Sequence, residues 1–215
     1  MRPLNECALF QDLPEAELHA ALRFFAAQER TYPRGALLKA APAPLPAFGL
    51  VLDGQVRVSM TDIDGREMLL SQVGAGHTFG EALCYLQSGA PIIISAAADA
   101  SILWLRCEGL RRPQQSALEG LLQQRFTAML ARRTLQMNDR IQILSRAGIR
   151  EKLMAFFTEC ARDAGSSAFD IPFDRAGMAA YLGVDRSALS RALSQLQRQG
   201  VLRYRKNHFE LTSGS

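Results

Sequence analysis

The sequence predicts an α+β protein in which a β-roll, one long helix and a compact pair of helices with a small hairpin follow one another. Three patterns predict this order. Residues 37–106 alternate polar and apolar side chains between glycine-containing turns, and residues 114–144 repeat apolar side chains every three or four positions. Residues 174–211 have the signals of two short helices and a hairpin. We therefore expect three parts, at residues 1–113, 114–145 and 146–215.

The composition indicates a soluble globular chain. Of the 215 residues, 48% are hydrophobic and 21% charged, which suffices for a sizeable core. No apolar run follows a basic start, and the most apolar stretch, residues 91–98, is far too short to cross a bilayer. We therefore expect a cytoplasmic protein with no membrane partner. The scattered cysteines Cys7, Cys84, Cys107 and Cys160 favour free thiols, and no metal, haem or iron–sulfur cluster is expected.

The β-rich region predicts a jelly roll, or double-stranded β-helix, because short strands alternate with turns. The turns are expected at residues 53–54, 62–65 and 74–76. The strands are expected at residues 55–61, 67–73, 92–98 and 102–105. A helix at residues 14–27 should lead into the roll, and the prolines of residues 41–46 predict a stiff loop, since proline cannot donate to a strand ladder.

The middle region predicts one amphipathic helix of about 46 Å. A helix this long has too little core of its own, so a partner helix in a homodimer is the natural cover for its apolar stripe. The alternative is a helix that lies along its own β domain. The expected dimer contacts are Leu118, Leu122, Phe126, Met129, Met137 and Ile141.

Residues 174–200 carry the local signals of two packed helices. Asp174 and Asp185 stand where N-caps are expected, and Gly183 permits a sharp turn between the helices. Leu189, Leu193 and Leu196 recur at helical spacing and should bury one face of the second helix. The opposite face is polar and basic.

Positive charge is concentrated in this segment. Residues 175–209 hold six arginines and one lysine against one acid, a net charge of +6, whereas the whole chain carries +4. Such a surface can bind phosphates and read base edges, so it predicts a double-stranded DNA partner. The alternative is a helical hairpin with an ordinary solvated face. Residues 201–211 predict a hairpin whose tip, residues 206–207, reaches the DNA backbone. The expected DNA contacts are Arg175, Arg186, Ser187, Ser190, Arg191, Ser194, Arg205 and Lys206.

A β-roll, a long helix and a C-terminal winged helix-turn-helix, in this order, resemble the Crp-Fnr family of bacterial transcription factors (cyclic-AMP receptor protein and fumarate–nitrate regulator). The most specific matches are residues 182–191, Leu-Gly-Val-Asp-Arg-Ser-Ala-Leu-Ser-Arg, and the Phe-Gly-Glu turn at residues 79–81. The resemblance implies a homodimer on a two-fold operator, with a small effector in a cyclic-nucleotide-binding-like roll that reorients the DNA-binding domains. It also makes RNA polymerase a candidate partner.

The resemblance carries over to particular residues. Arg186, Ser190 and Arg191 match positions that touch DNA in the family. Ser187 stands where many members have a glutamate that accepts from cytosine, so the family's usual half-site is not expected here. The implied effector pocket comprises Phe79, Gly80, Glu81, Ala82, Leu83, Pro91, Ile92 and Ile93.

This pocket departs from the cyclic-AMP binders, in which an Arg-Ser pair holds the cyclic phosphate. The matching positions are Pro91 and Ile92, where a buried phosphate would lack a charge partner at a cost of several kcal/mol. We therefore expect an effector other than cyclic AMP, an uncharged or largely apolar one, or a pocket filled by its own side chains. To bind cyclic AMP, the chain would need an arginine from elsewhere, such as Arg125 or Arg132 of the long helix.

The sequence also bears on two alternative functions. A cupin-like metal enzyme needs two or three histidines with a carboxylate on neighbouring strands, and the roll offers only His77, so we do not expect an enzyme. The second is a DNA-binding protein that needs no effector and uses the roll only as a dimer scaffold.

Overall fold

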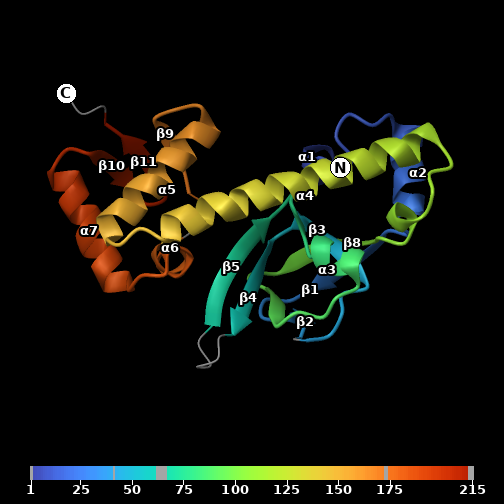
Figure 1. Ribbon diagram of the computed structural model, residues 1–215, viewed down its shortest axis with the longest axis horizontal. Coiled ribbons are helices and arrows are strands. Elements are labelled where there is room, and N and C mark those ends of the chain that lie inside the picture. Colours follow the sequence, from blue (N-terminus) through green and yellow to red (C-terminus); the bar gives the residue numbers. More distant parts are fainter. Residues whose placement is uncertain (1, 41, 62–66, 172–173, 213–215) are drawn as a thin grey trace. The chain divides into compact units, whose positions relative to one another are not determined.

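The computed structural model describes residues 2–40, 42–61, 67–171 and 174–212. The chain divides into two compact units, Met1–Thr134 and Leu135–Ser215, and the long helix α4, Ala117–Leu144, runs from one into the other (Figure 1). The observed architecture is the predicted α+β one, with a β-roll, a long helix and a helix-turn-helix. In the described part of the chain, every helix is too short or too polar to span a membrane.

The N-terminal unit is built on two antiparallel four-stranded sheets, ordered β1-β8-β3-β6 and β2-β7-β4-β5. Val51 and Ile102 of the first sheet pack against Val56 and Ile94 of the second, and all four side chains are fully buried. The strands are β1 Gln28–Tyr32, β2 Leu37–Lys39, β3 Ala47–Asp53, β4 Gln55–Thr61, β5 Glu67–Gly74, β6 Thr78–Phe79, β7 Ile92–Ala96 and β8 Ala100–Arg106.

The outer face of the first sheet is covered by helices. Phe48 and Leu105 project from the sheet into a second core that includes Phe25, after α2, and Phe126 on α4. Phe126 lies 5.6 Å from the ring of Phe48 and 5.6 Å from that of Tyr85. The helical elements here are α1 Arg2–Glu6, α2 Glu15–Phe24, α3 Glu81–Leu86 and the short turn η1 Gly109–Arg111.

The C-terminal unit surrounds one core in which Leu153, Phe157, Leu193 and Phe209 are all buried. Its three-stranded sheet has the order β10-β11-β9, so a strand before the helix pair completes the predicted hairpin. The elements are α5 Ile149–Ala164, β9 Ala168–Asp170, α6 Arg175–Leu182, α7 Arg186–Arg198, β10 Leu202–Arg205 and β11 His208–Leu211.

Several predicted boundaries differ from the observed ones. The helix expected at residues 14–27 ends at Phe24, and Gln28–Tyr32 is a strand that its polar sequence did not indicate. The Phe-Gly-Glu turn leads directly into α3, which was not predicted. The turn expected at residues 62–65 lies outside the described residues.

The expected dimer stripe also needs correction. Leu122 and Phe126 are 0% and 2% exposed because they fill the core of their own unit, so assigning them to a dimer contact was wrong. Leu118 and Met129 pack partly against the same core. Met137 and Ile141, in contrast, are 65% and 61% exposed. The apolar side chains of this helix therefore fall into two groups, one buried in the N-terminal unit and one exposed near the end of the helix.

Candidate functional site

The two helices α6 and α7 are fixed by their caps. The Asp174 carboxylate accepts a hydrogen bond from the Gly177 amide at 2.7 Å, and the Asp185 carboxylate accepts from the Ser187 and Ala188 amides at 2.9 and 3.0 Å. Between them Gly183 has a φ of 61°, the left-handed conformation that glycine adopts without strain. The predicted caps and turn are thus confirmed.

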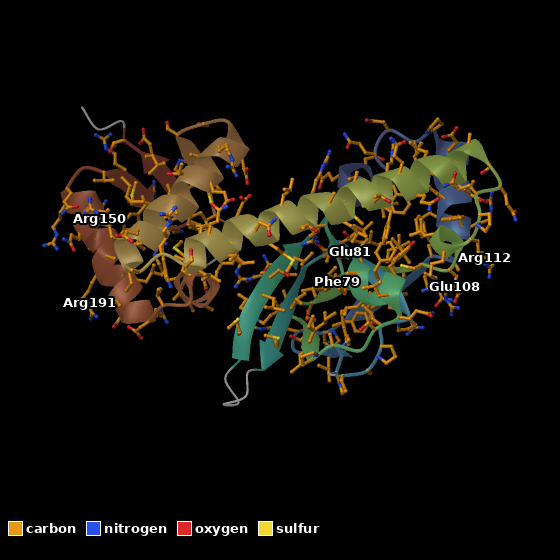
Figure 2. All side chains as sticks on the ribbon, viewed as in Figure 1. Phe79, Glu81, Glu108, Arg112, Arg150 and Arg191 are labelled. Atoms are coloured by element: carbon orange, nitrogen blue, oxygen red, sulfur yellow. The ribbon has the colours of Figure 1, made fainter. Side chains whose placement is uncertain are left out.

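The two faces of α7 have opposite character. Leu189, Leu193 and Leu196 are at most 1% exposed and anchor the helix to the core of its unit. The other face is exposed, and Arg191 projects from it away from that core (Figure 2). The structure brings onto this exposed face Arg186, Ser187, Ser190, Arg191 and Ser194.

The serines of this face are hydrogen-bonded within the helix. The Ser190 hydroxyl donates to the Arg186 carbonyl and the Ser194 hydroxyl to the Ser190 carbonyl, each at 3.0 Å. The Ser187 hydroxyl donates to the Asp185 carboxylate at 2.5 Å. This bond comes first among the interactions that lower the pKa of Asp185, which keeps the cap ionised. In this state the serines offer lone pairs to a ligand more readily than protons.

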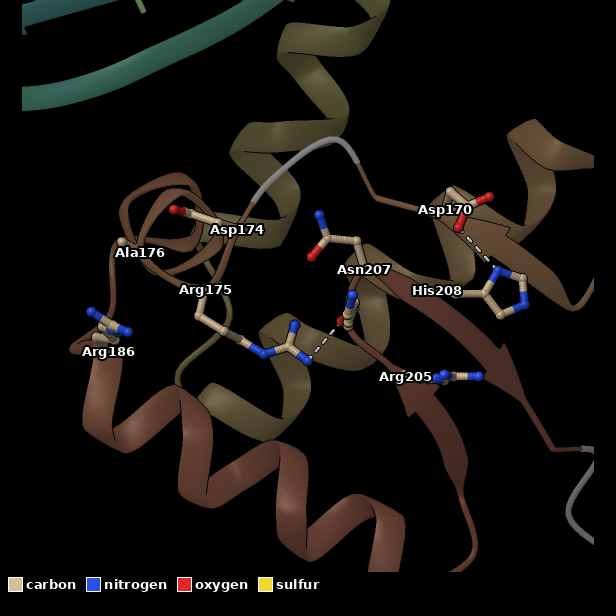
Figure 3. Close-up of a pocket in the computed structure, with 9 residues that line it drawn as sticks. Asp170, Asp174, Arg175, Ala176, Arg186, Arg205, Asn207 and His208 are labelled. Atoms are coloured by element: carbon tan, nitrogen blue, oxygen red, sulfur yellow. Dashed lines mark hydrogen bonds and ion pairs between the residues drawn. The ribbon is translucent and has the colours of Figure 1, made fainter.

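A second group of basic residues lies at the tip of the hairpin. Strands β10 and β11 pair from Leu202–Leu211 down to Arg205–His208, which leaves Lys206 and Asn207 as the two-residue tip, as predicted. Arg205 and Lys206 are exposed there. They line a groove of about 670 Å³ together with Arg186 at the start of α7, so the hairpin tip and the first residue of α7 share one surface (Figure 3).

Arg175 differs from the other predicted contacts because it is half-buried. Its guanidinium carbon lies 4.8 Å from the ring centroid of Tyr204 and 5.1 Å from that of Phe209. Its Nη2 donates to the Lys206 carbonyl at 3.0 Å (Figure 3). Burial lowers the pKa of this arginine. The geometry therefore makes Arg175 a support for the hairpin tip, with its charge directed at aromatic rings.

In the roll, Glu81 is 6% exposed and has partners from its own unit. The Thr78 hydroxyl donates to its carboxylate, and Arg133 of α4 approaches it at 3.3 Å. The nearby Phe79 ring is buried, lies over Gly49 and packs edge-to-face on Trp104 at 5.5 Å. Figure 2 shows Phe79 and Glu81 close together in the roll. The arginine of α4 that reaches this region is thus Arg133.

Arg125 and Arg132, the two arginines considered from sequence, instead line a separate cavity of about 250 Å³ beside the N-terminal segment. Arg125 donates to the carbonyls of Leu9 and Gln11. The sequence could not distinguish Arg132 from Arg133, because adjacent residues on a helix differ only in the direction they face.

The remaining predicted pocket residues do not all face the roll interior. Ile92 packs into the inner core beside the fully buried Ile94. Ile93 lies between them on the same strand and therefore points to the opposite face, so its assignment to the pocket was wrong. Pro91 and Ala82 are exposed, and Leu83 packs partly against the inner core.

Lys39 is a buried residue that sequence reasoning missed. It is 5% exposed, and its Nζ donates to the carbonyls of Ile92, Ala90 and Ala40 at 2.9, 3.2 and 3.4 Å. Burial lowers the pKa of this ammonium. The segment that would hold a phosphate in the cyclic-AMP binders thus turns carbonyl oxygens toward a cation of the protein itself. Among the described residues, no cluster of three or more metal-ligating side chains occurs.

Two domain families match the chain. Residues 151–213 match the "Crp-like helix-turn-helix domain" and residues 29–112 match the "Cyclic nucleotide-binding domain". A curated relative, the cyclic AMP receptor protein of Thermus thermophilus, is 29% identical over 199 residues, which span 91% of this chain and 88% of the relative.

Solved structures show the same architecture. The catabolite activator protein of Thermus thermophilus is 27% identical with a TM-score of 0.55, over 95% of this chain and 93% of that one. FixK2 of Bradyrhizobium japonicum is 24% identical with a TM-score of 0.68, over 87% and 93% of the two chains. The c-di-GMP-responsive regulator CLP of Xanthomonas campestris is 18% identical with a TM-score of 0.67, over 94% and 100%. The last two similarities bear on the fold alone.

Proposed function

Because the chain belongs to the Crp-Fnr family of transcription regulators, we propose that it acts as a homodimer that binds a two-fold operator in double-stranded DNA. The family's helix-turn-helix domain and cyclic nucleotide-binding domain are both present. One observation carries the proposal: α7 has a completely buried leucine face and an exposed basic and polar face, next to an exposed basic hairpin tip. The protein would act in the cytoplasm as a regulator without catalytic activity.

Different residues are assigned different tasks. Arg186 and Arg191 are exposed on α7 and can reach base edges in the major groove, where arginine pairs with guanine O6 and N7. Arg205 and Lys206 lie at the hairpin tip, where they can contact phosphates. Arg175 then acts indirectly, by holding the tip in place.

The test compares specific and random DNA duplexes in binding titrations at several salt concentrations. Arg191→Ala should cost about 1–3 kcal/mol on the specific duplex and relax the preference at one base pair in each half-site. Lys206→Ala should weaken both duplexes alike and reduce the salt slope by about 1. Arg34→Ala removes a positive charge from the surface of the roll, so it is the control and should change neither the DNA affinity nor the salt slope. Equal losses for Arg191→Ala on both duplexes would refute base reading by this residue.

The dimer is assigned to the exposed apolar side chains Met137 and Ile141, which lie one helical turn apart on α4. Met137→Asp should shift the protein toward monomer in a sedimentation experiment, because the substitution would bury a pair of like charges in the dimer interface. Leu86→Asp, at a position 71% exposed on α3, is the matched control and should remain dimeric. A fully dimeric Met137→Asp would place the interface elsewhere. RNA polymerase remains a candidate partner from the family resemblance.

The effector of the roll, in this proposal, is not cyclic AMP. Lys39 lies at the segment that holds the phosphate in the cyclic-AMP binders, but it donates its three hydrogen bonds to backbone carbonyls. The Glu81 carboxylate already contacts Thr78 and Arg133. The same contacts favour the second candidate function, a regulator that binds DNA without an effector, because Lys39 and Glu81 already have partners within the roll.

Calorimetry with cyclic AMP and cyclic GMP should show no binding to the roll. Saturable binding that Glu81→Ala abolishes would refute this expectation. DNA affinity measured with and without a small-molecule extract of the source cells separates the two functions, since only an effector-controlled protein responds to the extract.

A further inference from the structure

A cavity of about 190 Å³ in the N-terminal unit is lined by residues of strands β1 and β8 and of the segment 45–47. It is smaller than the roughly 300–1,000 Å³ of sites for drug-sized ligands, so it suits a small molecule. The strand register explains how it forms. Gln28 pairs with Trp104 and Ala47 with Arg106, and residues directly opposite each other project to the same face.

The inner wall of this cavity is apolar and aromatic. Leu38, Leu45, Tyr32 and Trp104 line it, and all four also pack against the inner core of the roll. Trp104 Nε1 donates to the Tyr32 hydroxyl at 3.0 Å, and the rings pack edge-to-face at 6.4 Å. The hydroxyl accepts this bond, so its own proton stays available as a donor.

The rim of the cavity is basic. Arg30 and Arg106 line it together with Gln28, and none of its lining residues is acidic. The acid between two of these positions, Glu29, lies on the opposite face of β1, where it accepts from the Ser101 hydroxyl at 2.6 Å.

The present partners of the two arginines are weak ones. Arg30 reaches the Gln28 amide oxygen at 3.5 Å, and Arg106 reaches Glu108 at 3.8 Å with both side chains more than half exposed. Contacts of this kind contribute little and can be exchanged for a bound carboxylate.

From this arrangement we infer a binding site for a small organic anion with an apolar or aromatic body, such as an aromatic carboxylic acid. The ring would lie against Trp104 and Leu45, and the carboxylate would accept hydrogen bonds from Arg30, Arg106 and the Tyr32 hydroxyl. The inference concerns ligand binding to the roll alone, so it holds or fails independently of DNA binding.

The chain offers a direct probe of this site, because Trp104 is its single tryptophan. Phenylacetate is titrated into the full-length protein without DNA, following tryptophan fluorescence and, in parallel, heat. Two controls separate the parts of the ligand: phenylacetamide has the same ring without charge, and acetate has the charge without the ring. We expect saturable binding of phenylacetate at or below about 1 mM, with at least fivefold weaker binding of both controls.

Charge-removing variants test the rim. Arg30→Gln and Arg106→Gln should each raise the Kd about three- to fivefold, and the double variant should raise it further. Arg57→Gln, an exposed arginine on β4 in the other sheet, is the matched control and should leave the Kd unchanged. Equal binding of phenylacetamide, an unchanged Kd in the double variant, or the absence of saturation in both signals would each overturn the inference.

Discussion

Removing either partner of the ion pair between Glu81 and Arg133 should destabilise the protein, and the two losses should be unequal. The Glu81 side chain is 8% exposed and that of Arg133 is 35% exposed. Arg133→Ala leaves a buried carboxylate with Thr78 as its remaining donor, and stranding a buried charge costs about 3–5 kcal/mol in a dry site. Because water can replace the partly exposed guanidinium, we expect Arg133→Ala to lower the free energy of unfolding by a smaller amount, about 2 kcal/mol. Glu81→Ala removes the buried charge itself, and Arg133 can still donate to water and to the Thr78 carbonyl. We therefore expect this variant to lose only about 1 kcal/mol of unfolding free energy.

Urea unfolding measures both values, at one fixed protomer concentration because the proposed dimer would contribute to stability. Trp104 fluorescence reports on the roll. Arg132→Ala, an exposed neighbour that does not touch Glu81, should stay within about 0.5 kcal/mol of wild type. The double variant should be less destabilised than the sum of the single variants. Equal losses for the two single variants, or a larger loss for Glu81→Ala, would refute the reasoning from burial.

Two further predictions concern the C-terminal unit. Arg175→Ala should lower the free energy of unfolding by about 1–2 kcal/mol, because it removes the stacking on Tyr204 and a hydrogen bond; a variant as stable as wild type in urea would show that Arg175 is no support. Partial burial and the hydrogen bond to Asp139 raise the pKa of Glu159 from 4.5 to about 7. The folded state then binds more protons than the unfolded one, so stability should fall as pH rises from about 4.5 to about 7. Thermal melts of Glu159→Gln should show a flatter pH dependence, and an unchanged slope would contradict the assignment.

The helix pair α6 and α7 could be predicted because its signals are local. Asp174 and Asp185 cap helices through amides two or three residues away, and Gly183 sets one backbone conformation. The strands between residues 55 and 105 were recognisable for a similar reason, since alternation along a strand follows from burial of one face. The edge strand Gln28–Tyr32 has one face open and four exposed residues, so no such pattern arises.

The sequence-based predictions that were wrong or incomplete concern features that depend on tertiary contacts. An apolar stripe shows that a helix face will be covered, but it does not say by what: Phe126 is covered by the roll, whereas Met137 is left exposed. Charge indicated DNA binding for Arg175, yet its position over Tyr204 requires the fold of the hairpin. The role of Lys39 likewise depends on carbonyls more than fifty residues later in the chain.

The buried position of Lys39 makes the protein suitable for amine labelling. The chain has three lysines, one in the roll, one on α5 and one at the hairpin tip. Lys206 is exposed and should react at once with an acylating reagent, whereas Lys39 can react only when the roll opens, because its amine is enclosed by carbonyls. Peptide mass spectrometry would assign each modified lysine. A single labelling time course would therefore report the opening rate of the roll at one lysine and the accessibility of the hairpin tip at another.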